Sequence, residues 1–455
     1  MAPSSHKTIR TSQPIFLDPK MIRQHIRTLI RNQYRLHPRE ATRQTHAVLN
    51  EIWQFVAFAS VQLQANEQRQ ALLTLKAVTD VLTDQWMHLN DIHSEVSAFF
   101  QELTRVWTET VLQVDLTDTE RKRWAKQVTI WQTRLADWHS IREAFAVPQA
   151  ALREGWDYSP LQRILQGAAL QERAWDGEIP AYAPLLTQAR LVVLEQQEKF
   201  QEYLYLAKAE GQTRAYVTML VRQRQIPEAI SYGQHHLTTA EDALAVAQAL
   251  WTHGARSEGL QIADLGITLD GDHVPLAIWL RDQSWRIGEQ AQALKAGEVA
   301  FQGEPTLKHY LHLTHIAGTQ WPQYRARLLD NARQAPSTTD AHGLLQIFLH
   351  EHLFEDAIAV LKTDRRHTLV ALVVDAALKE QTALEWVVQA CRQQAEHIMN
   401  GAKASYYQAA ANWLTKARTA YHLLGQDDTW HVYLNDLAER HQHKSKLLPL
   451  LRALA

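Results

Sequence analysis

Four arginines near the start of the chain recur every four residues, at Arg23, Arg27, Arg31 and Arg35. This spacing places them on one face of an α-helix, and a guanidinium group binds phosphates and carboxylates. The stripe could meet a row of nucleic-acid phosphates, each contact adding salt-dependent affinity, or an acidic protein partner. The commoner explanation is a solvated helix face, or a face docked on the acidic remainder of the chain.

Histidines gather at two places, as His309, His312 and His315 and as His350 and His352 on either side of Glu351. Zinc and copper bind imidazole, and histidines three residues apart on a helix can share a metal. However, the chain has 23 histidines, so such groups arise by chance, and histidines two apart on a helix point in different directions. We therefore predict no metal ligand.

No motif for catalysis or cofactor binding occurs in the chain. Phosphate-binding loops, dinucleotide fingerprints and nucleophile elbows are missing. Asp270 and Asp272 resemble the start of a calcium loop without its later ligands, which indicates an interhelical turn. Cys391 is the only cysteine, which excludes an intrachain disulfide. We predict a protein that is not an enzyme and has no cofactor; an unrecognised hydrolase or metal enzyme is the third hypothesis.

Three tryptophans, Trp124, Trp131 and Trp138, are spaced by seven residues, with Val128 and Leu135 on the same helical face. Exposed indoles in such a row could stack nucleic-acid bases. A seam buried in a helical core is the commoner cause of the pattern, and we favour it.

The elements that must position these residues are helices. Gly and Pro together make only 30 of 455 residues, well below the roughly 12% of average usage. Both disfavour helix interiors, so their scarcity predicts an all-α chain with short connections. Thr117 and Glu120 form a predicted capping box, and Asp18 before Pro19 predicts the start of a helix.

A small residue followed by a branched apolar one recurs at Ala229, Gly259, Ala293 and Ala357. The intervals are 30, 34 and 64 residues, and the last is two steps of 32. This period is typical of stacked helical hairpins of the tetratricopeptide (TPR) kind. Five residues before each small residue we expect the hairpin turn, at Arg224, Gly254, Gly288 and His352. We expect a diverged copy at Ala326.

Four regions are predicted from this pattern. Residues 1–17 form a disordered lead, and residues 18–154 an N-terminal helical region. Glycines, prolines and aromatic residues crowd residues 155–185, which predicts a turn-rich aromatic joint. Residues 186–455 form a TPR-like α-solenoid.

Six stretches carry a resemblance to a known family: residues 116–139, 155–167 (GWDYSPLQRILQG), 175–181 (WDGEIPA), 202–221, 276–283 and 411–422. They resemble the helical region that follows the zinc module in bacterial SWIM zinc-finger family proteins. That module has a Cys-x-Cys then Cys-x-His pattern, which one cysteine cannot supply. The resemblance implies a binding scaffold linked to DNA transactions, with the zinc finger lost or on another polypeptide.

The most favoured function is a non-enzymatic scaffold that binds a protein segment on the solenoid surface. The alternative is a nucleic-acid-associated adaptor that uses the basic helix, together with a zinc-finger-bearing partner chain. The net charge of −2 gives no global attraction to nucleic acid or anionic membrane. We find no secretory signal and no membrane span, and expect a cytoplasmic protein.

The basic stripe gives a first test. If it binds nucleic acid, the affinity of the purified protein for DNA should fall steeply between low and physiological salt. Replacing Arg27→Glu together with Arg31→Glu should then weaken binding, because two phosphate contacts become repulsive. Binding that the double substitution leaves unchanged would rule the stripe out.

Overall fold

The structure is a computed structural model that describes residues 18–34, 38–89, 95–138, 141–168, 175, 178–401 and 403–455. Across these residues the regular secondary structure is helical, and the only strand-like feature is an isolated bridge between Thr239 and Asp270. The all-α prediction is confirmed. The predicted lead at 1–17 and Arg35 lie outside the described residues.

The chain forms two compact units, Met1–Gln225 and Ile226–Ala455. The predicted region boundaries at 154/155 and 185/186 stay predictions, and both fall within the first unit.

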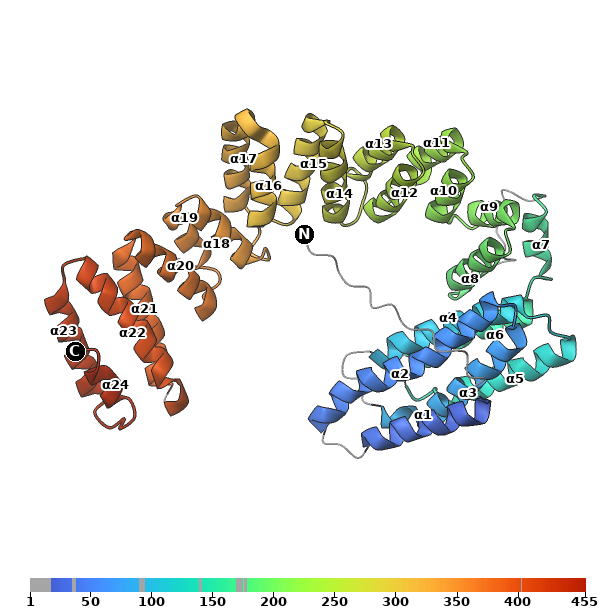
Figure 1. Ribbon diagram of the computed structural model, residues 1–455, viewed down its shortest axis with the longest axis horizontal. Helices are drawn as coiled ribbons and strands as arrows, with labels where there is room; N and C mark the ends of the chain where they lie inside the picture. The colour runs from blue at the N-terminus through green and yellow to red at the C-terminus, as the bar shows by residue number, and fades with distance from the viewer. Residues whose placement is uncertain are drawn as a thin grey trace. The chain divides into compact units, whose positions relative to one another are not determined.

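The first unit is built from ten α-helices and one short 3-10 turn in its described residues (Figure 1). They are α1 (Pro19–Tyr34), α2 (Pro38–Gln64), α3 (Gln68–Gln85), η1 (Trp86–His88), α4 (Glu95–Gln113), α5 (Asp118–Arg134), α6 (Ala146–Glu154), α7 (Ser159–Leu165), α8 (Ala183–Gln196), α9 (Phe200–Ala209) and α10 (Thr213–Arg222). Helix α4 packs against α2, α3, α6 and α8, so it lies at the centre of this unit.

The tryptophan seam belongs to the core of the first unit. Trp131 is completely buried, as are Val128 and Leu135, and its ring packs 5.2 Å from that of Trp107. Helix α5 ends at Arg134, so Trp138 lies beyond it. The core interpretation is confirmed for Trp131.

Two predicted helix starts are also confirmed. Thr117 caps α5 by accepting a hydrogen bond from the Glu120 backbone N–H, while the Glu120 carboxylate accepts one from the Thr117 backbone. Asp18 accepts a hydrogen bond from the Lys20 backbone N–H at the start of α1. Both side chains satisfy amides that the first turn of a helix leaves unpaired.

The second unit continues as helices that follow one another in chain order (Figure 1). They are α11 (Ile226–His236), α12 (Ala240–Thr252), α13 (Arg256–Gly266), α14 (His273–Arg286), α15 (Gln290–Gly303), α16 (Leu307–Ala317), η2 (Gly318–Gln320), α17 (Trp321–Arg333), α18 (Ala341–His350), α19 (Phe354–Val360), α20 (His367–Glu380), α21 (Leu384–Asn400), η3 (Ala404–Tyr406), α22 (Tyr407–Leu423), α23 (Asp427–Arg440) and α24 (Leu448–Arg452). Most contact the next helix and several the next but one, as in α12–α13–α14 and α18–α19–α20. This is a solenoid of stacked helical hairpins.

The predicted turns have the backbone geometry that a tight hairpin needs. Arg224, Gly254, Gly288 and His352 all have a left-handed conformation, with φ between 58° and 89°. At Gly254 and Gly288 glycine adopts this conformation without the strain that a Cβ would add. The small residues five positions later, Ala229, Gly259, Ala293 and Ala357, are all buried. The repeat register is therefore confirmed at four places.

The prediction of a diverged repeat copy at Ala326 is wrong, because the Ala326 side chain is exposed, whereas the small residues of the other copies are buried. The 3-10 turn Gly318–Gln320 comes between α16 and α17 and changes where α17 begins. The buried stripe of α17 is formed instead by Leu328, Leu329 and Ala332.

Ion pairs at or near the surface join the second helices of successive hairpins. Lys295 of α15 lies 2.7 Å from Asp264 of α13, and Arg327 of α17 lies 2.6 Å from Glu298 of α15. Pairs at a protein surface contribute about 0–1 kcal/mol each. Burial of each hairpin's apolar side chains against its neighbours is therefore the larger source of stability.

The close approach of α15 to its neighbours gives a test. A Cβ added at Gly297 would lie 2.6 Å from Leu313 Cδ2 of α16, so Gly297→Val should overpack this contact. We expect it to lower the free energy of unfolding by about 1–3 kcal/mol. The measurement is urea denaturation followed by circular dichroism.

Ala291→Val, at an exposed position of the same helix, is the matched control and should change stability little. Equal stabilities for the two variants would contradict close helix packing at Gly297.

Candidate functional site

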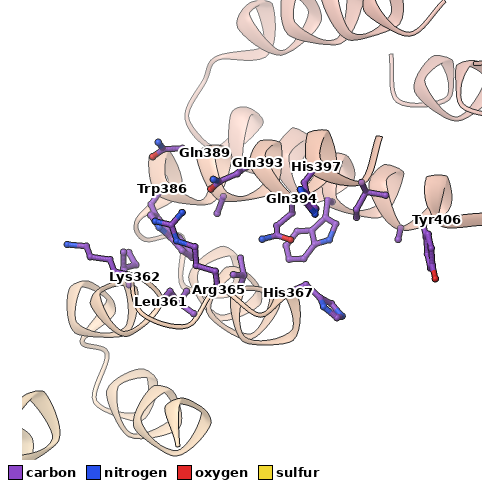
Figure 2. Close-up of a pocket in the computed structure, with 16 residues that line it drawn as sticks. Leu361, Lys362, Arg365, His367, Trp386, Gln389, Gln393, Gln394, His397 and Tyr406 are labelled. Atoms are coloured by element: carbon purple, nitrogen blue, oxygen red, sulfur yellow. The ribbon is translucent and has the colours of Figure 1, made fainter. Parts of the chain in front are cut away.

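An open groove of about 810 Å³ lies in the second unit, between the segment that joins α19 to α20 and helices α21 and α22 (Figure 2). Its lining residues from the α19–α20 side are Ile358, Leu361, Lys362, Arg365, His367 and Val370. Those from α21, η3 and α22 are Trp386, Gln389, Ala390, Gln393, Gln394, His397, Ile398, Tyr406, Ala409 and Trp413.

Helix α21 contributes one complete face to the groove. Trp386, Gln389, Gln393 and His397 recur at helical spacing and line it. The opposite face, with Val387, Cys391 and Ala395, is fully buried in the core of the unit. The helix is thus held on one side by packing, and its other side is open.

The groove is rich in positive charge. Lys362 and Arg365 are exposed and stand opposite Gln389 and Gln393 across the groove in Figure 2, and His367 and His397 lie further along it. None of its described lining residues is acidic. Neither Lys362 nor Arg365 has an ion pair or hydrogen bond from its side chain to any residue that the structure describes.

The next basic residue along the chain, Arg366, shows the contrast. Its guanidinium group donates hydrogen bonds to Asp364, at 2.7 Å for the shortest, and holds the pKa of that carboxyl below its usual range. Arg366 is therefore neutralised by Asp364 and does not line the groove. Its neighbour Arg365 lines the groove and has no such ion pair with a described residue.

Aromatic side chains give the groove its apolar surface. The Trp413 side chain is nearly buried, at 7% exposure, whereas Tyr406 is 56% exposed. Trp386 is half-buried on α21. Indole and phenol rings offer large apolar faces at a small entropic cost when a partner binds.

The single cysteine of the chain does not line the groove. Cys391 is on the far face of α21, and burial raises the pKa of its thiol to about 12. A thiol attacks as its thiolate, so Cys391 is unreactive at neutral pH. What the groove offers is hydrogen-bond donors, cations and apolar rings.

The structure describes the predicted arginine stripe from Arg23 to Arg31. Ile22, Ile26 and Ile30 form the buried face of α1. Arg23 is half-buried, with Nε 3.5 Å from Asp80 Oδ2, so it belongs to the packing of the first unit. Arg27 and Arg31 are exposed, and neither pairs with a described acidic residue. Their role as phosphate or acidic-partner contacts stays a prediction.

The histidine groups have structural partners. His309 is buried, and its Nδ1 lies 3.0 Å from Arg281 Nη1. The Glu351 carboxylate accepts a hydrogen bond of 2.6 Å from the Tyr310 hydroxyl and pairs with Arg325. His352 pairs with Glu380. In the part of the chain that the structure describes, no three His, Cys, Asp or Glu side chains could hold a metal ion.

A second cavity, of about 930 Å³, lies in the first unit between α4, residues 141–147 and α8. Its charged side chains pair with one another: Arg105 binds both Glu102 and Glu109. Burial raises the pKa of Glu109, against the opposing effect of Arg105. Because these charged side chains already pair with one another, the groove beside α21 is the stronger candidate.

Comparison with known proteins gives no family. No family model matches the chain, and no curated protein matches it. Among solved structures, the TPR domain of P58(IPK) matches with 11% identity, covering 96% of this chain and 97% of that one, at a TM-score of 0.19. A circular tandem repeat protein with novel repeat topology matches with 12% identity, 96% and 95% coverage and a TM-score of 0.25. No described helix is long and apolar enough to cross a membrane.

The sequence analysis did not single out the groove residues. The signal was present in the segment 386–397, where an apolar stripe predicts one buried helix face and Trp, Gln and His recur on another. What the sequence could not show is that the segment 361–367 lies opposite that face.

Cys391 provides a direct test of how α21 is packed. We expect its thiol to react very slowly with a disulfide reagent at pH 8 in the native protein, because the side chain is buried and its pKa is raised to about 12. In denaturant the reaction should be fast. Rapid modification of the native protein, followed by absorbance of the released thiolate, would show that α21 is oriented differently.

Proposed function

We propose that this chain is a non-enzymatic protein-binding scaffold and that the groove beside α21 holds a short segment of its partner. The supporting observation is that four groove-lining polar side chains have no partner within the described structure: Lys362, Arg365, Gln389 and Gln393. Aromatic rings line the same groove. Such side chains, held by a rigid helical framework, can bind main-chain and side-chain groups of an extended peptide.

The size of the groove supports a peptide rather than a globular surface. Trp386 and His397 are eleven residues apart on α21, which corresponds to about 16 Å along the helix axis. An extended chain advances about 3.3 Å per residue, so about five residues of a partner would span this length. We propose that the scaffold acts in the cytoplasm.

The relationship to SWIM zinc-finger family proteins is a separate proposal, supported by the resemblance of the sequence alone. In it, the zinc finger is carried by a partner chain, and Arg27 and Arg31 on the exposed side of α1 contact nucleic acid. Both arginines are exposed in the structure, as this role requires.

The scaffold proposal is tested with a random peptide library displayed on phage and selected on the immobilised full-length chain. We expect enriched peptides that bind the wild-type protein and lose at least tenfold in affinity for Gln393→Trp, because the bulky indole fills the groove at an exposed position. The measurement is fluorescence anisotropy with the synthetic peptides.

Gln408→Trp makes the same substitution at an exposed position of α22 that does not line the groove. It should leave binding within about twofold. No enrichment, or peptides that tolerate Gln393→Trp, would reject the groove as the site.

A further inference from the structure

The charge of the groove is opposite in sign to the net charge of the unit that contains it. The second unit, Ile226–Ala455, carries 20 Lys and Arg against 25 Asp and Glu, a net charge of −5. Within it, the groove lining includes Lys362 and Arg365 and, among the described residues, no carboxylate. The groove therefore carries positive charge in a unit whose net charge is negative.

The two cations are also available for a ligand. Neighbouring basic side chains are tied to acidic ones: Arg366 pairs with Asp364, and Lys416 pairs with Asp375 at 2.6 Å. Lys362 and Arg365 make no such pair with a described residue, and both are exposed. A carboxylate that enters the groove would gain two charge-assisted hydrogen-bond donors without displacing an existing partner.

Apolar contacts complete the recognition chemistry. The Trp386 and Trp413 rings line the groove on the sides of α21 and α22, with Leu361 and Val370 opposite. Ion pairs near a surface contribute little to affinity, so burial of an apolar side chain of the ligand must supply most of it. The charges then select which apolar segment binds.

From these observations we propose that the groove recognises an internal acidic segment of a partner protein, in which carboxylates adjoin an aromatic or large aliphatic residue. The carboxylates pair with Lys362 and Arg365, and the apolar side chain lies against Trp386 or Trp413. This inference rests on the scaffold function proposed for the same groove.

A nucleic-acid strand fits the same groove less well. A single strand carries a phosphate at every nucleotide, and its affinity depends on many cations along its path. The groove offers two permanent positive charges, and the second unit as a whole has a net charge of −5, which would repel a polyanion that extends beyond the groove. A short segment with two carboxylates matches the number of cations.

The test uses three labelled peptides, acetylated and amidated, that differ only at two positions: Glu-Glu-Leu-Phe-Leu, Gln-Gln-Leu-Phe-Leu and Lys-Lys-Leu-Phe-Leu. Anisotropy titrations with the full chain should give the tightest binding for the Glu-Glu peptide, at least tenfold tighter than the Lys-Lys peptide. The double variant Lys362→Glu with Arg365→Glu should reverse this order. Its circular dichroism spectrum and thermal unfolding should match the wild type, because both side chains are exposed.

Lys379→Glu is the matched control, since this residue is an exposed basic residue of α20 that has no ion pair with a described residue and does not line the groove. It should keep the preference for the Glu-Glu peptide, with affinity within twofold.

Equal binding of the three peptides by the wild type, or an unreversed preference in the double variant, would overturn the acidic-segment inference. Selected library peptides that still depend on Gln393 would then leave the scaffold function standing, whereas failure of both assays would remove it as well. A further outcome is that oligo-dT displaces the labelled Glu-Glu peptide at a lower concentration than the unlabelled Glu-Glu peptide does. That result would assign the groove to single-stranded nucleic acid and would also overturn the inference.

Discussion

Close contact between helices that are too short to be stable alone is the constraint on which the second unit depends. Many of its helices have 10 to 14 residues, a length at which an isolated helix is marginal in water. Glycines mark the closest contacts: a Cβ at Gly266 would lie 2.5 Å from Ala243 Cβ of α12 and 2.6 Å from Leu276 Cδ2 of α14. Each hairpin therefore depends on its neighbours for burial of its apolar side chains.

The same constraint explains why a binding surface arises at α21. A stacked hairpin buries one face of each helix and leaves another at the surface. Between α13, α15 and α17 that outer face carries ion pairs such as Lys295 with Asp264. Along α21 it faces the segment 361–367 instead, and the side chains on both sides remain available for a ligand. Rigidity on the buried side, with Cys391 and Ala395 in the core, holds the open side in place.

Sequence reasoning reached the fold through turns and small residues. The left-handed turns at Gly254 and Gly288 and the buried Ala293 follow directly from the spacing, because a period near 32 residues repeats one hairpin. It failed at Ala326, where a 3-10 turn changes the start of the helix, a shift that local composition does not reveal. The groove could not be predicted from the sequence for a related reason. It forms only because two segments about 25 residues apart in the sequence lie opposite each other in the folded unit.

The central claim is that one face of α21 and the segment before α20 together hold an acidic peptide. Amide hydrogen exchange of the full chain, with and without saturating Glu-Glu-Leu-Phe-Leu peptide, tests it most directly. The account predicts slower exchange in residues 358–370 and 384–413, with the remainder of the second unit unchanged. Protection confined to other hairpins, or none at saturation, would contradict it.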